Sequence, residues 1–425
     1  MPNGPLPAEE VDAMSRMRIA TRRDLLKGGL GVIGVGSSLP NFLLNTGLAG
    51  QAAEPGQRIM VVLQLNGGHD GMSDVPPYGE PKYAEYRTAT RIPENEVIKL
   101  NPQYGLHPNL KGCKELLDQG RFAVVVGTGY PNFDYSHFEA MDIWETANET
   151  ERRKCGAGWL GKYLDLTVQG NPDPKLAIGV GFHKTPVLLW AKDHPGLAFN
   201  SPDAFRFSGL GDEPGQAAYR RINETAGKSG QVDLQFVTRT AISANAASEQ
   251  LRQVTSAYQT PIEYPNTGLA ASMRTIAGLI AGGLSTRIYY TAIGGFDTHG
   301  NQKPQHDSLM AQIDGAVSAF WKDLDRQGSS NRVLMITFSE FGRTVKENGS
   351  QGTDHGSAQP MFLMGPGVKP GCHGKYPSLT DLRPDGQFKM EIDFRSVYAA
   401  ILEKWLMTAS EPILGAKHDP LDCIA

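Results

Sequence analysis

This sequence of 425 residues has few cysteines, no excess of positive charge and no long apolar run. The formal net charge is −4 at pH 7, which gives no reason to expect the concentrated basic face that a polyanion needs. This balance argues against a nucleic-acid partner. Internal repeats and low-complexity tracts are also missing, which argues against a repeat architecture.

The four cysteines exclude a zinc ribbon, because none belongs to a CxxC pair and none has histidines at zinc-finger spacing. They are Cys113, Cys155, Cys372 and Cys423. An oxidising destination would permit up to two disulfides, whereas free buried thiols are equally compatible with these positions.

The apolar run near the N-terminus, residues 28–44, is broken by glycines and falls short of the ~20 residues that a membrane span needs. The twin-arginine pattern TRRDLLK precedes it at 21–27, and small residues follow it. We predict that residues 1–53 are an export signal, which takes the protein by the twin-arginine route to the periplasm or another extracytoplasmic space. The protein would then meet the membrane only through this signal. A membrane anchor is the alternative.

Glycine and proline are plentiful, at 49 and 28 residues, which indicates many structured loops between short elements. The length allows one large α/β domain or two ordinary ones. Residues 185–262 are rich in proline, glycine and polar residues. We therefore predict a single domain over residues 54–425, with an insertion or cap at about 185–262.

The remaining chain alternates between strand-like and helix-like segments. Residues 58–65 form an apolar run typical of a strand that is buried on both faces. A helical pattern at 109–119 and a second strand at 122–126 follow, and this order indicates a parallel βαβ unit. We expect further helices at 160–166, 267–283, 303–327 and 394–406, and further strands at 176–180, 286–293, 332–338 and 361–364. The fold class is therefore α/β, with a doubly wound, mostly parallel sheet flanked by helices.

Four of the predicted strands lead directly into chemically reactive side chains. Ligands of an open parallel sheet bind beyond the carboxyl ends of its strands, so these side chains can meet there. The pairs are His69 with Asp70, Ser136 with His137, Asp297 with His299, and Glu340 with Arg343, and His355 follows the last pair. Carboxylates and imidazoles on rigid elements are what a hydrolytic metal site needs. A role in turns alone would explain the neighbouring glycines, but it would not readily explain His299, Glu340 and His355.

Each candidate also has an ordinary structural interpretation. Asp297 and His299 are metal ligands or a hydrogen-bonded loop pair, and Glu340 is a ligand or the ion-pair partner of Arg343. Asp354, beside His355, is a turn residue or a group that orients a ligand. Asp70 is a further candidate ligand.

Ser136 lies at the predicted start of a helix, where an alkoxide or an anionic ester is favoured. It is therefore a candidate nucleophile. The spacing to Glu139 also fits a capping box, which would commit the serine oxygen to a backbone amide. If Ser136 is only a cap, water activated by a metal is the alternative nucleophile. His137 is a candidate acid or base, and Arg343 is a candidate clamp for anionic oxygens.

Five motifs in this order resemble those of one bacterial family of exported proteins, catalogued as domain of unknown function 1501. The family is a branch of the alkaline-phosphatase superfamily. The motifs are NGGHDGMS at 66–73, SHFEAMDIW at 136–144, GFDTH at 295–299, FSEFGR at 338–343 and GTDHG at 352–356.

The resemblance implies an alkaline-phosphatase-like core with one or two divalent metals. Asp297, His299 and His355 would bind one metal, and Asp70 and Glu340 would serve a second. Phe341 follows Glu340 here, whereas the superfamily commonly has Asp-His at this place.

These observations together predict an exported, metal-dependent hydrolase of phosphate or sulfate esters. The ion would be zinc, manganese, calcium or magnesium, and the substrate a small-molecule or glycan ester. The alternative is a non-catalytic exported protein with the same fold, which recognises an anionic glycan or a protein partner. Phe341 is the residue that favours this alternative. A third interpretation is that these residues bind a cation that only stabilises the structure.

Overall fold

The computed structural model describes residues 57–150, 156–170, 173–202 and 247–425, together with residues 217 and 221. The predicted export signal and much of the predicted cap lie outside the described residues. Within the described residues, none of the helices is both long enough and apolar enough to span a bilayer.

A nine-stranded sheet forms the centre of the described part of the chain. Its order is β12-β4-β11-β8-β1-β7-β5-β6, and β13 pairs with β4. The strands are β1 (Ile59–Asn66), β4 (Phe122–Gly129), β5 (Ala177–Val180), β6 (Leu197–Phe199), β7 (Ile288–Gly294), β8 (Val333–Phe338), β11 (Gln359–Met364), β12 (Gly371–His373) and β13 (Ile392–Asp393). Every pairing is parallel except those of β11, which runs antiparallel to β4 and β8. The predicted mostly parallel α/β sheet is confirmed.

The first two predicted strands, β1 and β4, are parallel but are not neighbours in the sheet. β8 and β11 lie between them. β11 covers the predicted strand at 361–364, and its direction is opposite to that of the other strands. The direction of a strand depends on the edge of the sheet at which the preceding loop enters. The apolar pattern of residues 361–364 therefore predicts a strand but not its direction.

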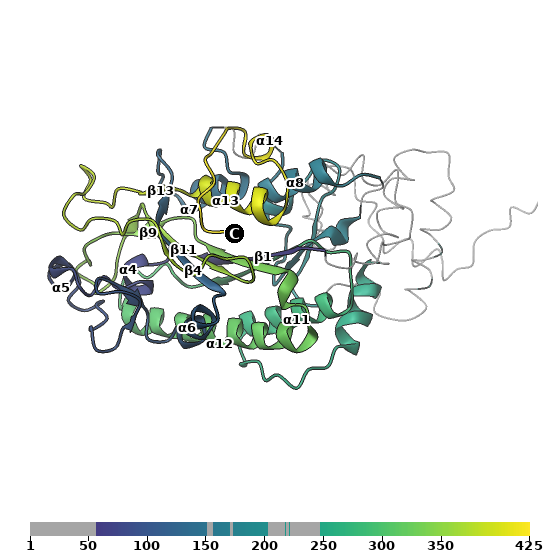
Figure 1. The fold of residues 1–425 in the computed structure, drawn as a ribbon, viewed down its shortest axis with the longest axis horizontal. Coiled ribbons are helices and arrows are strands. Elements are labelled where there is room, and N and C mark those ends of the chain that lie inside the picture. Colours follow the sequence, from purple (N-terminus) through teal and green to yellow (C-terminus); the bar gives the residue numbers. More distant parts are fainter. Residues whose placement is uncertain (1–56, 151–155, 171–172, 203–216, 218–220, 222–246) are drawn as a thin grey trace, which may run out of the picture.

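Helices cover both faces of the sheet, as Figure 1 shows. One face carries α6 (Lys111–Asp118), α11 (Gly268–Ala281) and α12 (Gln302–Gln327), and the other carries α7 (His137–Thr146), α8 (Trp159–Thr167), α13 (Phe394–Ala400) and α14 (Glu411–Leu414). β1 shows why two layers form. Ile59, Val61 and Leu63 belong to the apolar core on the α11 and α12 side, whereas Met60 and Val62 belong to the core on the α7 and α13 side. Because side chains alternate along a strand, an apolar residue at every position buries both faces.

The helix ends follow the local signals in the sequence. Thr267 Oγ1 accepts the Ala270 backbone N–H at the start of α11, and Asp393 accepts that of Arg395 at the start of α13. Gly120, which follows α6, has a φ of 71°. The predicted helix at 394–406 is observed as α13 followed by a π turn, η5 (Ile401–Trp405).

The remaining elements are short. They are α4 (Gly71–Asp74), α5 (Pro81–Tyr86), β2 (Ile98–Lys99), β3 (Gly105–Leu106), η2 (Pro174–Leu176), η3 (Val187–Leu189), η4 (Ser330–Arg332), β9 (Gly342–Arg343) and β10 (His355–Gly356), and residues 247–257 are helical. β9 and β10 form an antiparallel ribbon that places Arg343 opposite His355. The three described cysteines, Cys113, Cys372 and Cys423, are free thiols, and Cys155 lies outside the described residues.

Glu145 is a carboxyl group of α7 that is buried against the sheet. The Tyr290 hydroxyl lies 3.0 Å from Glu145 Oε1 and 2.6 Å from Gln64 Oε1. One hydroxyl proton cannot serve both oxygens, but a protonated Glu145 would donate to Tyr290 and leave Tyr290 free to donate to Gln64. Burial raises the pKa of Glu145 from 4.5 to about 7, against the opposing effect of the Tyr290 hydrogen bond.

This shift predicts a pH-dependent stability that a Glu145→Gln variant should lack. The folded protein holds the proton more tightly than the unfolded chain, so the stability is present below pH 4.5 and is lost as the pH rises to about 7. Relative to the variant, the native protein should lose on the order of 3 kcal/mol of unfolding free energy over that interval. Urea denaturation of both proteins across this range measures the difference. A pH-independent difference would contradict the assignment.

Candidate metal centre

Loops at the carboxyl edge of the sheet carry the candidate side chains. The loop after β7 carries Asp297 and His299, and the loop after β4 leads to Ser136 and the start of α7. The segment after β8 carries Glu340 and enters the ribbon of β9 and β10. The edge therefore gathers residues that lie more than 200 positions apart in the chain.

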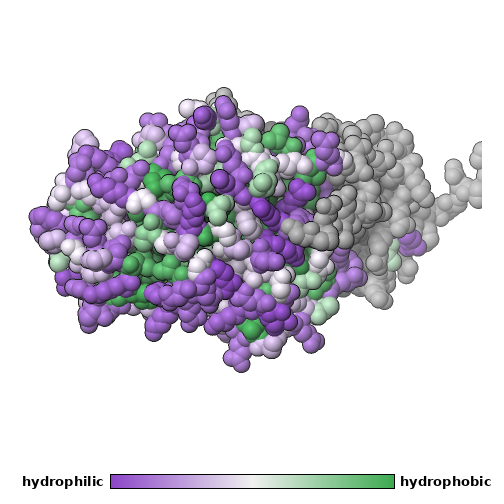
Figure 2. Space-filling view, in the orientation of Figure 1, coloured by the Kyte–Doolittle hydropathy of each residue, from purple (hydrophilic) through white to green (hydrophobic). Residues whose placement is uncertain are grey.

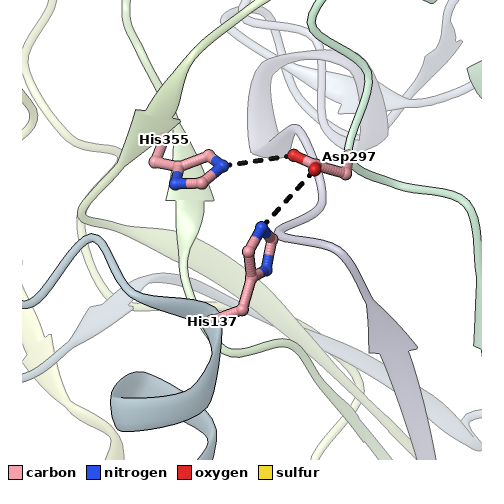
Figure 3. A group of neighbouring side chains, drawn as sticks. All are labelled: His137, Asp297 and His355. Atoms are coloured by element: carbon pink, nitrogen blue, oxygen red, sulfur yellow. Dashed lines mark hydrogen bonds and ion pairs between the residues drawn. The ribbon is translucent and has the colours of Figure 1, made fainter.

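Three of these side chains form a tight group. One possible ligand atom from each of His137, Asp297 and His355 lies within 4.8 Å of the others. Figure 3 shows His137 at the end of its helix and His355 on its short strand, both directed at Asp297. His355 Nε2 is 3.1 Å from Asp297 Oδ1, and His137 Nε2 is 3.5 Å from Oδ2. We refer to His137, Asp297, His299 and His355 as the donor cluster.

His299 joins the other three through two contacts. Its Nε2 lies 3.0 Å from Asp297 Oδ1 and 3.2 Å from His355 Nε2. The sequence-predicted ligands Asp297, His299 and His355 are thus brought together. His137, which the sequence suggested as an acid or base, lies in the same group.

The other ring nitrogen of each histidine is held by an acceptor. His137 Nδ1 is 2.7 Å from Glu340 Oε1, His299 Nδ1 is 2.8 Å from Asp354 Oδ1, and His355 Nδ1 is 2.8 Å from the Tyr135 carbonyl oxygen. A carboxylate or a carbonyl can only accept, so each Nδ1 carries the proton. In the neutral form of each imidazole, Nε2 then carries a lone pair on the side that faces the carboxylate of Asp297.

Asp297 is held by a buried guanidinium on its inner side. Arg343 Nη2 donates to Asp297 Oδ1 at 2.7 Å. Partial burial opposes ionisation of this carboxyl, but the hydrogen bond and the positive charge of Arg343 outweigh that effect, and the pKa is lowered to about 2. The carboxylate is therefore ionised at neutral pH.

Arg343 itself is 1% exposed and binds mainly backbone carbonyls. Its N–H groups donate to the oxygens of Gly67, Gly68, Phe296 and Thr353. The arrangement joins the loops after β1 and β7 to the segment before β10. Arg343 is thus directed at the protein's own loops and at Asp297, whereas the sequence suggested a clamp for substrate oxygens.

Glu340 is fully buried, and its carboxylate has three partners. Oε1 accepts the Gly67 backbone N–H at 2.9 Å and lies against His137 Nδ1, and Oε2 accepts the Ser339 hydroxyl at 2.9 Å. The hydrogen bond to Glu340 raises the pKa of His137. Glu340 therefore orients His137, and its ion pair is with His137, whereas the sequence suggested Arg343 as the partner.

Phe341 forms an apolar wall of the donor cluster. Its ring is 4.8 Å from that of His137 and 4.5 Å from that of His355, measured between centroids. Gly68 passes so close that an added Cβ would lie 2.4 Å from the Phe341 ring, and its φ of 73° also favours glycine. A side chain at position 68 would displace the ring.

Asp70, the other sequence-predicted ligand, lies outside the donor cluster in a buried network of its own. Arg87 donates to both of its oxygens, at 2.6 and 2.9 Å, and Ser73 donates to Oδ2 at 2.6 Å. The neighbouring His69 pairs with Asp74, which also binds His306 Nε2 at 2.7 Å. These groups are all buried beneath the loops.

Gln302 connects this buried network to the donor cluster. Its Nε2 donates to Asp70 Oδ2 at 2.6 Å, and its Oε1 accepts the hydroxyls of Thr298 and Thr353 at 3.1 and 2.5 Å. Thr298 lies between Asp297 and His299, and Thr353 precedes Asp354 and His355 in the chain. Gln302 therefore holds the two ligand-bearing loops in register. Its sequence position, at the start of a helix, favours solvent exposure and gives no sign of this role.

Ser136 caps α7, which is one of the two roles that the sequence allowed. Its Oγ accepts the Glu139 backbone N–H at 3.4 Å, a long hydrogen bond. The bond uses a lone pair of the oxygen and leaves the hydroxyl proton available to another acceptor. Lys303, in the first turn of α12, pairs with Asp307 at 2.8 Å.

Removal of the Gln302 side chain should destabilise the fold. Gln302→Ala removes the acceptor of two buried hydroxyls and one of the donors to Asp70, so we expect a loss of about 2 kcal/mol in unfolding free energy. Gln302→Glu should cost more, because it places a second carboxylate against Asp70. Urea denaturation measures both.

Gln305→Ala is the matched control, since Gln305 is exposed on the same helix and donates to the Gly300 carbonyl at 2.9 Å. It should cost less than about 1 kcal/mol. Equal losses for Gln302→Ala and Gln305→Ala would contradict the bridging role.

Comparison with solved structures returns distant similarities to phosphatases and sulfatases. The PsFucS1 sulfatase from Pseudoalteromonas sp. is 10% identical, with a TM-score of 0.37 over 85% of this chain and 68% of that chain. A protein of the alkaline phosphatase superfamily from Vibrio parahaemolyticus is 9% identical, with a TM-score of 0.37 over 86% and 71%. A variant of the alkaline phosphatase from the Antarctic bacterium TAB5, with Mg bound, is 12% identical, with a TM-score of 0.33 over 75% and 93%.

No curated protein matches the chain. The model of a family described as a protein of unknown function, DUF1501, matches residues 124–405. This segment is more than half of the chain and contains four of the five motifs that carried the resemblance. The protein therefore belongs to the DUF1501 family.

Proposed function

We propose that this protein is an exported hydrolase of phosphate or sulfate esters that depends on a divalent metal ion. One observation carries the proposal. Three histidines direct their Nε2 atoms at the carboxylate of Asp297, while an acceptor holds each Nδ1. Histidines that bind metals in proteins commonly donate the other ring N–H to a carboxylate or a carbonyl in this way.

The donor cluster fits a cation on electrostatic grounds. His299 Nε2, His355 Nε2 and Asp297 Oδ1 lie 3.0 to 3.2 Å from one another, and the histidine protons are engaged on the far side of each ring. Lone pairs at such distances repel unless a proton or a cation lies between them. Imidazole nitrogens suit zinc, whereas magnesium and calcium prefer oxygen ligands, so zinc is the best fit of the four ions.

The surroundings favour one ion over two. Asp70 and Glu340, the candidates for a second ion, already accept hydrogen bonds from buried groups. The guanidinium of Arg343 places a fixed positive charge 2.7 Å from Asp297 Oδ1, and Phe341 supplies an apolar surface beside His137 and His355. A second cation would meet a positive charge and a hydrocarbon ring.

The ion would supply Lewis-acid chemistry, by drawing electron density from an oxygen of the ester. The chain itself supplies an anion-binding helix end, because the first N–H groups of α7 have no partner within the helix. Ser136 lies at this end, directly before His137, and its hydroxyl is the nucleophile that we propose. Arg343 and Glu340 hold Asp297 and His137 in orientation during the reaction.

The purified protein should retain one zinc ion per chain after exhaustive dialysis. A His299→Ala, His355→Ala double variant should lose it, because two of the four donor side chains are removed. Elemental analysis measures the content, and zinc should raise the unfolding temperature of the native protein but not that of the variant.

His373→Ala is the matched control for this experiment. His373 is a half-buried histidine on the edge strand β12, where its ring bonds to the Lys369 carbonyl. It should bind zinc like the native protein. Absence of metal from the native protein, even after incubation with zinc or manganese, would rule out the metal-dependent hydrolase.

Replacement of Ser136 distinguishes a nucleophile from a cap. Ser136→Ala should lower ester turnover by about 10³-fold or more if the hydroxyl attacks the ester, and should cost about 1 kcal/mol of stability through the lost cap. Thr267→Ala removes the equivalent cap of α11 and should show the stability loss alone. Undiminished turnover by Ser136→Ala would assign Ser136 to capping only and leave water as the attacking group.

A second candidate function is a non-catalytic exported protein that recognises an anionic glycan or a protein partner. Phe341 favours it, because a buried phenylalanine stands where the superfamily commonly has a histidine ligand. Retention of zinc without turnover of any phosphate or sulfate ester would select this function. Export itself rests on the twin-arginine pattern at 21–27.

A further inference from the structure

Exposed large apolar side chains are few on the described surface, which is largely hydrophilic in the view of Figure 2. The described residues include four, Tyr135, Phe138, Leu166 and Met407. Two of them, Tyr135 and Phe138, directly flank Ser136 and His137. Their side chains are 46% and 76% exposed. Exposed apolar groups gathered at one place commonly mark a binding surface.

Tyr135 and Phe138 are tied to the donor cluster by backbone geometry. The carbonyl oxygen of Tyr135 is the acceptor for His355 Nδ1 at 2.8 Å. Phe138 follows His137 in the first turn of α7, and side chains on a helix lean toward its N-terminus. The end toward which Phe138 leans is therefore the end that faces the donor cluster.

Polar groups from a distant loop complete this surface. The Tyr135 hydroxyl lies 3.2 Å from Asp385 Oδ2, and the Arg383 guanidinium lies 5.9 Å from the centre of the Phe133 ring. The Phe133 and Tyr135 rings meet edge to face, with centroids 4.6 Å apart. We refer to Phe133, Tyr135, Phe138, Arg383 and Asp385 as the aromatic rim.

We propose that the aromatic rim binds an uncharged sugar ring, which carries the ester group to the donor cluster. A pyranose ring has an apolar face of C–H bonds and an edge of hydroxyl groups. Aromatic rings match the face, and the carboxylate of Asp385 and the guanidinium of Arg383 match the hydroxyls as acceptor and donor. This inference rests on the proposed function and specifies its substrate class as a sugar ester.

The mixture of groups in the aromatic rim favours a sugar over a lipid chain. An alkyl chain packed against Tyr135 would also cover Asp385 and Arg383, and would remove water from these charges without replacing its hydrogen bonds. Sugar hydroxyls can replace them. Asp385 and Arg383 also pair with each other, with Oδ1 and Nε 3.4 Å apart, so the aromatic rim has no net charge that would attract an anionic group on the same ring.

The experiment measures sugar binding separately from ester hydrolysis. Maltose, cellobiose and lactose are titrated by calorimetry into the zinc-loaded native protein and into Phe138→Ala, Tyr135→Ala and Leu166→Ala. Leu166 is the matched control, an exposed apolar residue of α8 with 51% exposure. We expect at least one disaccharide to bind the native protein and Leu166→Ala equally. Its Kd should rise about tenfold in each rim variant, which corresponds to about 1.4 kcal/mol for a lost ring contact.

A kinetic arm compares glucose 6-sulfate and glucose 6-phosphate with methyl sulfate and methyl phosphate. The rim variants should lower the ratio of kcat/KM for the sugar ester to that for the methyl ester, whereas Leu166→Ala should not. Rim-dependent sugar binding without hydrolysis of any ester would support the aromatic rim and overturn the hydrolase. Ester hydrolysis with an unchanged ratio, and no disaccharide bound, would overturn the aromatic rim and leave the hydrolase intact.

Discussion

The buried guanidinium of Arg343 is the interaction on which the candidate centre depends. It donates to backbone carbonyls of the loops after β1 and β7 and of the segment before β10, and also to the carboxylate of Asp297. A guanidinium is planar, always charged and rich in donors, so it can join several loops through one rigid group. A lysine would offer a point charge and fewer N–H groups. Without Arg343, the inner side of Asp297 would lack its cation, and the loops would lack their common tie.

A layer of buried polar groups supports the donor cluster from below. Glu340 fixes His137, and Gln302 joins the loops of His299 and His355 to the pair of Asp70 and Arg87. Buried charges are costly unless they are paired and hydrogen-bonded, and each of these carboxylates has such partners. The hydrogen bonds of this layer restrict each imidazole to one orientation. Rigid support of this kind keeps metal ligands in place before the ion arrives.

The proposed activity follows from what this layer leaves unsatisfied. Three imidazole nitrogens and one carboxylate face one another, whereas Glu340, Asp70 and Gln302 have hydrogen-bond partners within the chain. In the centre that we propose, Phe341 and Arg343 would limit the space to one ion, and the start of α7 would offer amide groups and the Ser136 hydroxyl beside it. The aromatic rim extends the same site outward, so the metal chemistry and the sugar recognition that we propose share a single helix end.

The sequence by itself determined the elements and the edge at which the site lies. Period, caps and glycines act within a few residues, so most of the longer strands and the start of α7 were predictable from it. The grouping of His355 with Asp297 and His299 was an expectation from the family resemblance, since these residues lie far apart in the chain. The direction of β11, the bridge through Gln302 and the partners of Asp70, Glu340 and Arg343 were decided only by the tertiary structure. These contacts join residues that are far apart in the chain, as Gly67 and Glu340 are. A carboxylate becomes a metal ligand, an ion-pair partner or a support according to which donors the fold brings to it.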